Sequence, residues 1–338
     1  MTVNKKTTIP GLGDGPLVWV LSDGTAGMVA QSLALAQAMD VPYFDVRIMA
    51  SPIYRLFPQM GTWPTMPISP RRSDRRIGPP WPDVVITCGK RTAGAALAIR
   101  RLSEGKTKIV QIQDPRIKPS YFDVMVTPQH DPISQRGLDN VIVSKASLNR
   151  LKMSDIAKAA KGLDKGFKRA KKATATAVMI GGNNRRYKAS AEDFAAFGAQ
   201  LADFAKADSV GAGGRHLVLI GSRRTPRYAM GAIEEALRGC SYVIWDGKGE
   251  NPYPGILGVV DDVIVTSDSV NMASEACLTG KPVYIAQLRT ETGRIAAFHE
   301  MMMKDGHTKP LGQSFDRPPE ILDEMASIGR QVKEALGL

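Results

Sequence analysis

Short apolar runs alternate with alanine- and leucine-rich stretches along most of the chain. In the first half, runs of strand length occur at 17–21, 42–48, 83–87, 108–113, 123–127 and 140–144. Stretches of helical composition follow the first and third runs and end near Met39 and Leu102. Residues 50–82 interrupt this alternation with a proline-rich segment that includes Arg71, Arg72, Arg75 and Arg76. We expect irregular structure there, and irregular segments of this length are often functional.

The second half of the chain repeats the alternation. Its apolar runs lie at 176–180, 216–220, 242–245, 262–266 and 282–286. Ser190 and Asp193 have the spacing of a capping box, which predicts a helix start at this point. The helix behind it carries aromatic and aliphatic residues at helical spacing, namely Phe194, Phe197, Leu201 and Phe204. Further helices are predicted at 270–278 and, from the spacing of apolar residues, at about 319–336.

Strands that alternate with helices indicate parallel sheets covered on both faces. Two such runs predict an α/β fold with two Rossmann-like domains facing across a cleft. The expected segments are an N-terminal domain at 1–150, a linker helix at 151–172, a C-terminal domain at 173–318 and a terminal helix at 319–338. Ligands of open parallel sheets bind at the carboxyl ends of the strands. The chemistry is therefore expected in the loops that follow the strands.

Composition favours a cytoplasmic globular protein. The chain has 338 residues, of which 43% are hydrophobic, yet no apolar run approaches the roughly 18 residues of a membrane span. The N-terminus has no apolar core of the kind that signal peptides contain. The three cysteines, Cys88, Cys240 and Cys277, are far apart and odd in number. This pattern excludes a disulfide framework and a Cys-x-x-Cys metal site, and indicates reduced thiols.

Positive charge is concentrated in one segment. The net charge is +12, and residues 145–172 carry ten Lys or Arg against two Asp. Within 156–172 the apolar residues fall on one side of a helix and the lysines on the other, which predicts a basic amphipathic helix. Two interpretations stay open: a helix packed on its domain with a solvated lysine face, or attachment to an anionic membrane surface. Nucleic acid is disfavoured because the basic face lacks interleaved aromatic residues.

Several common motifs are absent from the sequence. There is no Gly-x-x-x-x-Gly-Lys-Ser/Thr phosphate loop and no Gly-x-Ser-x-Gly elbow. The glycine clusters at 11–15 and 211–214 precede strands rather than follow them, unlike a dinucleotide fingerprint. No Asp-x-Asp sequence signals a metal-held diphosphate. We therefore expect neither a cofactor nor a metal ion.

The segment 266–285 is the strongest positive signal. A strand runs into Ser267, Asp268 and Ser269, and a helix starts directly behind them. The free amides of such a helix start could bind a diphosphate without a metal. Glu275 lies nearly two turns into that helix, where its carboxylate could accept hydrogen bonds from ribose hydroxyls. The alternative is an ordinary N-cap at Ser269 and a solvated Glu275.

The sequence Ser-Glu-Ala-x-x-x-Gly-Lys-Pro at 274–282 resembles the nucleotide-sugar half of GT-B glycosyltransferases, such as the lipid II and lipid A disaccharide synthases. In those families the matching Glu holds the ribose and the helix start faces the diphosphate. A wider set of short motifs resembles the mitochondrial fission Elm family, in its bacterial branch. These motifs lie at 19–27, 113–116, 128–131, 180–182, 222–226, 245–247, 251–253 and 267–269.

This resemblance covers about residues 17–320 and implies a GT-B-like fold, in which the terminal helix packs back towards the N-terminal domain. It does not imply one activity, because plant members are described as adaptors for a dynamin-like protein and bacterial members look like glycosyltransferases. One departure affects the chemistry. Many members carry His after the last glycine of the first loop, and this sequence has Met28 there.

Sugar transfer with inversion needs a general base, and three residues are candidates. Asp23 directly follows the first strand, and His130 and Asp131 follow a later one. Each could instead be an ordinary turn residue. The predicted substrate-binding residues lie in the strand-end loops and include arginines that could pair with phosphate. They are Gly24, Arg91, Arg116, Gly181, Gly182, Asn183, Ser222, Arg223, Ser267, Asp268, Ser269 and Glu275.

Two functions are therefore in view. The first is a membrane-peripheral, metal-free glycosyltransferase that takes a nucleotide-diphosphate sugar and a lipid or glycan acceptor, and attaches to the inner membrane face through 156–172. The second is a non-catalytic adaptor that keeps the fold and recruits a membrane-remodelling partner. Polar loops at the strand ends of both halves favour the first, because an adaptor has no need of them.

Overall fold

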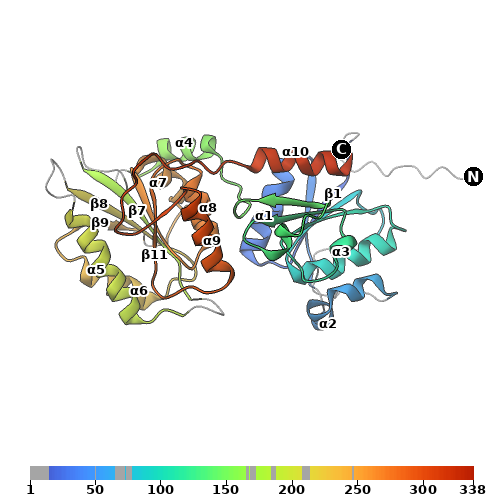
Figure 1. The fold of residues 1–338 in the computed structure, drawn as a ribbon, viewed down its shortest axis with the longest axis horizontal. Coiled ribbons are helices and arrows are strands. Elements are labelled where there is room, and N and C mark those ends of the chain that lie inside the picture. The colour runs from blue at the N-terminus through green and yellow to red at the C-terminus, as the bar shows by residue number, and fades with distance from the viewer. Residues whose placement is uncertain are drawn as a thin grey trace, which may run out of the picture. The chain divides into compact units, whose positions relative to one another are not determined.

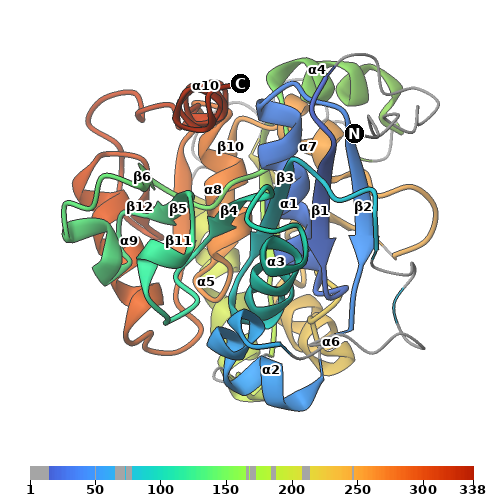
Figure 2. The same ribbon diagram turned by 90° about the vertical axis from the view of Figure 1, so that its right-hand side faces the viewer.

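The computed structural model describes residues 15–49, 51–64, 73, 78–164, 167, 173–183, 188–207, 214–245 and 247–338. Contacts divide the chain into two compact units. Unit 1 contains residues 1–150 and 324–338, and unit 2 contains residues 151–323. Each unit has its own parallel sheet with helices around it (Figures 1 and 2). The predicted α/β fold with two Rossmann-like sheets is confirmed.

Unit 1 is built on six parallel strands in the order β2-β1-β3-β4-β5-β6. The strands are β1 (Val18–Ser22), β2 (Tyr43–Arg47), β3 (Val84–Cys88), β4 (Lys108–Ile112), β5 (Val124–Pro128) and β6 (Val141–Ser144). In the centre, Trp19 is in register with Phe44 of β2 and Val85 of β3. All five residues of β1 and of β3 are buried, which explains why these strands read as continuous apolar runs.

The helices of unit 1 cover both faces of this sheet. They are α1 (Ala26–Ala38), α2 (Pro52–Leu56), α3 (Lys90–Leu102) and α10 (Met325–Leu336), with short 3-10 turns η1 (Pro58–Thr62), η2 (Pro119–Tyr121) and η3 (Pro132–Gln135). Val18 and Val20 pack in the core formed with α1 and α10, whereas Trp19 and Leu21 pack in the core formed with α3. The alternation of side chains along β1 therefore serves two layers.

The terminal helix α10 packs on α1. A Cβ atom at Gly329 would lie 2.2 Å from the Ala38 carbonyl oxygen, so only glycine permits this close crossing. Ile328 and Val332 of α10 are buried against the core that contains Leu35 of α1. The sequence predicts a start near 319, but the helix begins at Met325. Residues 319–324 lie outside regular structure.

Unit 2 contains a second sheet of six parallel strands in the order β12-β11-β10-β7-β8-β9. They are β7 (Thr174–Ile180), β8 (Arg215–Gly221), β9 (Ser241–Ile244), β10 (Asp262–Thr266), β11 (Val283–Ala286) and β12 (Lys309–Pro310). Its helices are α4 (Met153–Gly162), α5 (Ala191–Ala207), α6 (Arg227–Ala236), α7 (Tyr253–Val259), α8 (Val270–Cys277) and α9 (Arg294–Lys304). The predicted capping box is present, because Asp193 accepts from the Ser190 amide and Ser190 accepts from the Asp193 amide.

The basic helix is shorter than predicted. The sequence predicts a helix over 156–172, but α4 ends at Gly162 and Leu163 has extended backbone angles. Gly162 is a poor helix former, which accounts for the end at this point. Beyond Asp164, the residues of the segment apart from Phe167 lie outside the described residues. The apolar face of α4 packs on α7, where Cβ atoms at Gly255 and Gly258 would lie 2.9 Å and 2.7 Å from Ala159 and Ala160.

Candidate functional site

Three loops meet at the carboxyl ends of the unit 2 strands. They follow β7, β8 and β10, which are adjacent in the sheet. Asp268, in the loop after β10, has no exposed side-chain surface and connects all three. One carboxylate oxygen accepts from the Gly182 amide at 3.0 Å and pairs with Arg224 at 3.0 Å. The other accepts from the Thr266 hydroxyl at 2.7 Å. Asp268 thus holds the loops together from inside the protein.

Gly181 and Gly182 are required by the closeness of these loops. A Cβ atom at Gly181 would lie 2.0 Å from an Asp268 carboxylate oxygen, and one at Gly182 would lie 2.1 Å from the Arg224 carbonyl oxygen. The Gly181 amide donates to the Thr266 hydroxyl at 2.7 Å. Both amides are therefore directed to protein acceptors, so the two glycines position the loops.

A second buried group lies beneath the β10–α8 loop. The Ser267 hydroxyl donates to Glu291 at 2.8 Å, and His299 Nε2 lies 2.7 Å from the Ser267 carbonyl oxygen. Burial lowers the pKa of His299, although the Ser267 carbonyl and Asp268 oppose this shift. Burial also raises the pKa of Glu291; the Ser267 hydroxyl opposes this, and the charge of Asp268 adds to it. This loop is consequently held from below by α9 and the chain before it.

The start of α8 follows directly from these contacts. Ser269 is the N-cap residue, and its hydroxyl accepts from the Met272 amide at 3.4 Å. Helix geometry directs the first amides of α8 out of the helix end, where they carry partial positive charge. The buried carboxylate of Asp268 and the N-cap at Ser269 fix where this end points. An anion-binding position at the start of α8 is the arrangement that this geometry supports.

Glu275, further along α8, is half-buried rather than solvated. One of its carboxylate oxygens accepts from the Tyr253 hydroxyl of α7 at 2.8 Å. Burial raises the pKa of Glu275, with the Tyr253 hydrogen bond opposing the shift. Burial and the Glu275 carboxylate raise the pKa of Tyr253 well above its ordinary value. Tyr253 therefore orients Glu275 while leaving the second carboxylate oxygen for another donor.

The Glu275→Gln variant is expected to gain stability relative to the wild type as the pH rises. The folded protein keeps the Glu275 proton to a higher pH than the unfolded chain does, because burial raises the folded-state pKa. The wild type therefore loses free energy of unfolding as the pH rises from about 4.3 through that raised pKa. Urea unfolding of both proteins between about pH 4 and pH 8 measures the gap. A gap that does not change with pH contradicts the assignment, and the exposed Glu234→Gln is the control.

In unit 1, Asp23 lies at the end of β1 with both carboxylate oxygens engaged. One accepts from the Thr25 amide at 2.9 Å, and the other pairs with Arg91 of α3 at 3.1 Å. Burial raises the pKa of Asp23, but the Thr25 hydrogen bonds and Arg91 together outweigh it, so the net pKa lies below its ordinary value. The Arg47 guanidinium lies 3.0 Å from where a Cβ atom at Gly24 would be. The loop at Asp23 and Gly24 therefore places an ionised carboxylate close to two arginines, Arg47 of β2 and Arg91 of α3.

The other candidate bases lie elsewhere on the same sheet edge. His130 and Asp131 follow β5, which is separated from β1 by β3 and β4. At the usual strand spacing this corresponds to about 14 Å, so Asp23 cannot act on the same proton as these two residues. Asp131 is buried, and Arg116 is exposed with a φ of 62° in the loop after β4. The structure brings Asp23 and Arg91 together and keeps His130 and Asp131 apart from them.

A model of the family described as mitochondrial fission ELM1 matches residues 26–336. The chain belongs to this family. It is 30% identical over 284 residues to the mitochondrial fission protein ELM1 of Arabidopsis thaliana, covering 75% of this chain and 64% of that protein. It is 26% identical over 301 residues to protein RP120 of Rickettsia prowazekii, covering 79% of this chain and 82% of that protein. The chain thus spans just under two thirds of the plant relative.

Solved structures with the same fold include GT-B-type enzymes. The UDP-GlcNAc 2-epimerase of Neisseria meningitidis, bound to UDP-GlcNAc, aligns with a TM-score of 0.56 and 14% identity over 95% of this chain and 98% of that one. The glycosyltransferase of kitacinnamycin aligns with a TM-score of 0.51 and 13% identity over 96% of this chain and 94% of that one. The ELM1-family chain therefore has a GT-B-like fold.

Some predicted site residues of the ELM1-family chain have polar groups bonded within the protein. Asn183 donates to Tyr228, and Ser222 accepts from the Arg224 amide. The sequence predicts a substrate-binding role for Arg223, which is exposed, whereas its neighbour Arg224 forms the ion pair with Asp268. Sequence reasoning also missed several contacts of the site, made by Arg47, Thr225, Tyr253, Glu291 and His299. Thr225 and Tyr253 lie within the motifs at 222–226 and 251–253, and those motifs are the signal that the sequence offers for them.

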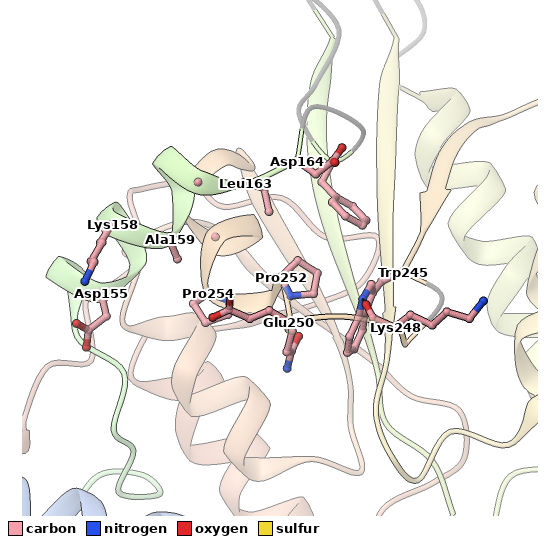
Figure 3. A pocket seen from close by; sticks show the side chains of 14 residues that line it. Asp155, Lys158, Ala159, Leu163, Asp164, Trp245, Lys248, Glu250, Pro252 and Pro254 are labelled. Atoms are coloured by element: carbon pink, nitrogen blue, oxygen red, sulfur yellow. The ribbon is translucent and has the colours of Figure 1, made fainter.

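Unit 2 also has an open cavity of about 580 Å³ near α7. Figure 3 shows its lining residues coming from α4 and from the segment between β9 and α7, with Trp245 on one side. Pro252 and Pro254 line the cavity, whereas Tyr253 between them bonds to Glu275. Within the described part of the chain, no group of three or more His, Cys, Asp or Glu is placed to hold a metal ion. None of the described helices is long and apolar enough to span a membrane.

Proposed function

We propose that unit 2 binds a nucleotide-diphosphate sugar and that the chain transfers the sugar to a lipid or glycan acceptor. The observation that carries the proposal is the pairing of a fixed helix start at Ser269 with a carboxylate, Glu275, oriented by Tyr253. Both groups lie on one short helix that follows the central strand β10. The UDP-GlcNAc bound to the Neisseria epimerase supports the choice of ligand class.

In the proposed donor complex, the diphosphate lies against the first amides of α8. Their partial positive charge would stabilise the leaving diphosphate without a metal ion. The ribose would then lie along the helix, where the Glu275 oxygen not used by Tyr253 accepts from its hydroxyls. Glu275 lies six positions after Ser269, which is about 9 Å along a helix. This separation suits a group that follows a diphosphate.

The acceptor would approach the strand ends of unit 1, where a base must take its proton. Asp23 is ionised, but its lowered pKa and its two bonded oxygens make it a weak base in this conformation. Release of Arg91 towards a phosphate would free one oxygen of Asp23 and raise its basicity. His130 and Asp131 are the alternative base at a separate position.

Calorimetric titration of uridine and guanosine diphosphates tests the donor site. The wild type should bind one of them, and Glu275→Ala should bind it at least tenfold more weakly, because bonds to a charged acceptor contribute about 1.5–3 kcal/mol each. Glu234→Ala, an exposed glutamate of α6, is the matched control and should bind like the wild type. At 100 times its dissociation constant the ligand should also add about 2.7 kcal/mol to the free energy of unfolding. Equal binding by Glu275→Ala would show that the site assignment is wrong.

A non-catalytic adaptor is the second candidate. The name of the Arabidopsis relative, a mitochondrial fission protein, favours it. So does the engagement of both Asp23 oxygens, which leaves that residue poorly prepared for base catalysis. If neither diphosphate binds the wild type, the adaptor becomes the better proposal. Binding without sugar hydrolysis or transfer would indicate an adaptor controlled by a nucleotide.

A further inference from the structure

Unit 1 exposes a group of large apolar side chains in one short segment. Leu56, at the end of α2, is 63% exposed, Phe57 is 52% exposed, and Trp63, just after η1, is 55% exposed. The other large apolar side chains that are comparably exposed in the described chain are scattered singly: Val143, Met153, Tyr228, Ile321 and Leu338. Scattered exposed apolar residues need no explanation, whereas a group within eight residues does. We call Leu56, Phe57 and Trp63 the α2–η1 patch.

The backbone beneath the α2–η1 patch is firmly packed. A Cβ atom at Gly61 would lie 2.0 Å from the Gly94 carbonyl oxygen, so η1 lies directly against α3. Pro58 and Gly61 are buried in this contact. Figure 2 shows α2 beside α3, near the ends of the unit 1 strands. The patch is therefore presented by a fixed element.

The sequence around the patch is positively charged. Residues 47–78 contain six arginines, no lysine and one acidic residue, Asp74. Tryptophan and phenylalanine close in sequence to several arginines are a combination that favours the interface of an anionic bilayer, where rings enter the headgroup region and guanidinium groups meet phosphates. A protein partner with an apolar surface would not require this excess of positive charge.

We propose that the α2–η1 patch inserts into the surface of an anionic phospholipid membrane. This inference does not depend on nucleotide binding in unit 2. In this proposal α4 does not insert into the membrane, although its lysines can attract an anionic surface. Ile156 of α4 and Leu163 directly after it are buried in unit 2, so Lys158 and Lys161 can attract a membrane but these two apolar residues cannot enter one.

Co-sedimentation of the full chain with vesicles tests the proposal. The wild type should sediment with vesicles of phosphatidylcholine containing about one third phosphatidylglycerol, and much less with phosphatidylcholine alone, because each nearby cation contributes about 1 kcal/mol. The triple variant Leu56→Ser, Phe57→Ser, Trp63→Ser should partition at least tenfold less. The matched control is Val143→Ser, Met153→Ser, Leu338→Ser, whose side chains are 44%, 48% and 44% exposed and which should sediment like the wild type.

A second measurement keeps the proposal testable if the triple variant is unstable. Brominated lipids should quench the fluorescence of Trp63 in otherwise wild-type protein, and Trp63→Phe should lose that quenched component. Absence of sedimentation by the wild type, equal sedimentation of the triple variant, or unquenched Trp63 would each overturn the proposal. Loss of binding in Lys158→Glu, Lys161→Glu with an intact α2–η1 patch would also overturn it and assign membrane attachment to α4.

Discussion

Replacing Asp268 with alanine is expected to lower the free energy of unfolding of unit 2 by about 3 kcal/mol. The Asp268 carboxylate is wholly buried and accepts from the Gly182 amide and the Thr266 hydroxyl. Alanine would leave both donors without their acceptor, and an unsatisfied buried polar group costs about 1–3 kcal/mol. Arg224 adds less to this loss, because its side chain is 38% exposed and can turn to water.

Urea unfolding followed by hydrogen exchange of β7 and β10 measures this effect in unit 2. Arg223→Ala is the matched control, since Arg223 is exposed beside Arg224 and its loss should change stability by less than about 0.5 kcal/mol. A double-mutant cycle of Asp268→Ala with Arg224→Ala separates the ion pair from the hydrogen bonds. A loss below about 1 kcal/mol in Asp268→Ala would contradict the role of Asp268 in holding the three loops.

Gly182→Ala should destabilise unit 2 to a similar extent or more, for a steric reason. The added Cβ atom would lie 2.1 Å from the Arg224 carbonyl oxygen and 2.7 Å from the Thr225 amide nitrogen. Both are backbone atoms of a loop that is bonded to β7 through Ser222 and Thr225, so neither can move without breaking hydrogen bonds. We expect a loss of about 3 kcal/mol, in the upper range for single substitutions.

The matched control for Gly182→Ala is Gly231→Ala. Gly231 lies within α6, and apart from its chain neighbours and the backbone of α6 itself, no atom lies within 4 Å of where its Cβ atom would be. Alanine there should raise stability by about 0.5–1 kcal/mol, because glycine is a poor helix former. Opposite signs for the two Gly→Ala changes, seen as shifts in thermal unfolding, are the expected result. A loss of stability at Gly231, or none at Gly182, would show that the packing at Gly182 is looser than described.

The pattern of apolar residues in the sequence is sufficient to locate most strands of both sheets. The run at 262–266 coincides with β10, and the run at 83–87 differs from β3 by one residue. Strands buried on both faces are apolar along most of their length, so each of them can be recognised in the sequence as a continuous apolar run. The capping box at Ser190 was equally readable, because its partners are three residues apart.

The short helices of unit 1 could not be read in this way. The sequence predicts irregular structure over 50–82, yet this segment contains α2 and η1. Elements of five residues gain little from intrinsic helix propensity. Their stability comes from packing on α3, above all at Gly61 and Gly94, which are 33 positions apart. The end of α4 at Gly162 was missed for the opposite reason, since its periodic pattern continued beyond the helix.

In the candidate site, the sequence by itself determined which loops carry polar groups, because each loop follows a recognisable strand. Only the tertiary structure decided what those groups do. The loops that bury Asp268 contribute Arg224 and Gly182, which are 44 and 86 positions away in sequence, and Tyr253 reaches Glu275 across 22 positions. Arg223 and Arg224 are identical in type and adjacent, and the turn held by Thr225 selects which one meets Asp268. A hydrogen bond requires a narrow range of donor–acceptor distance and a favourable angle at the hydrogen. The packing of segments that are distant in sequence sets both.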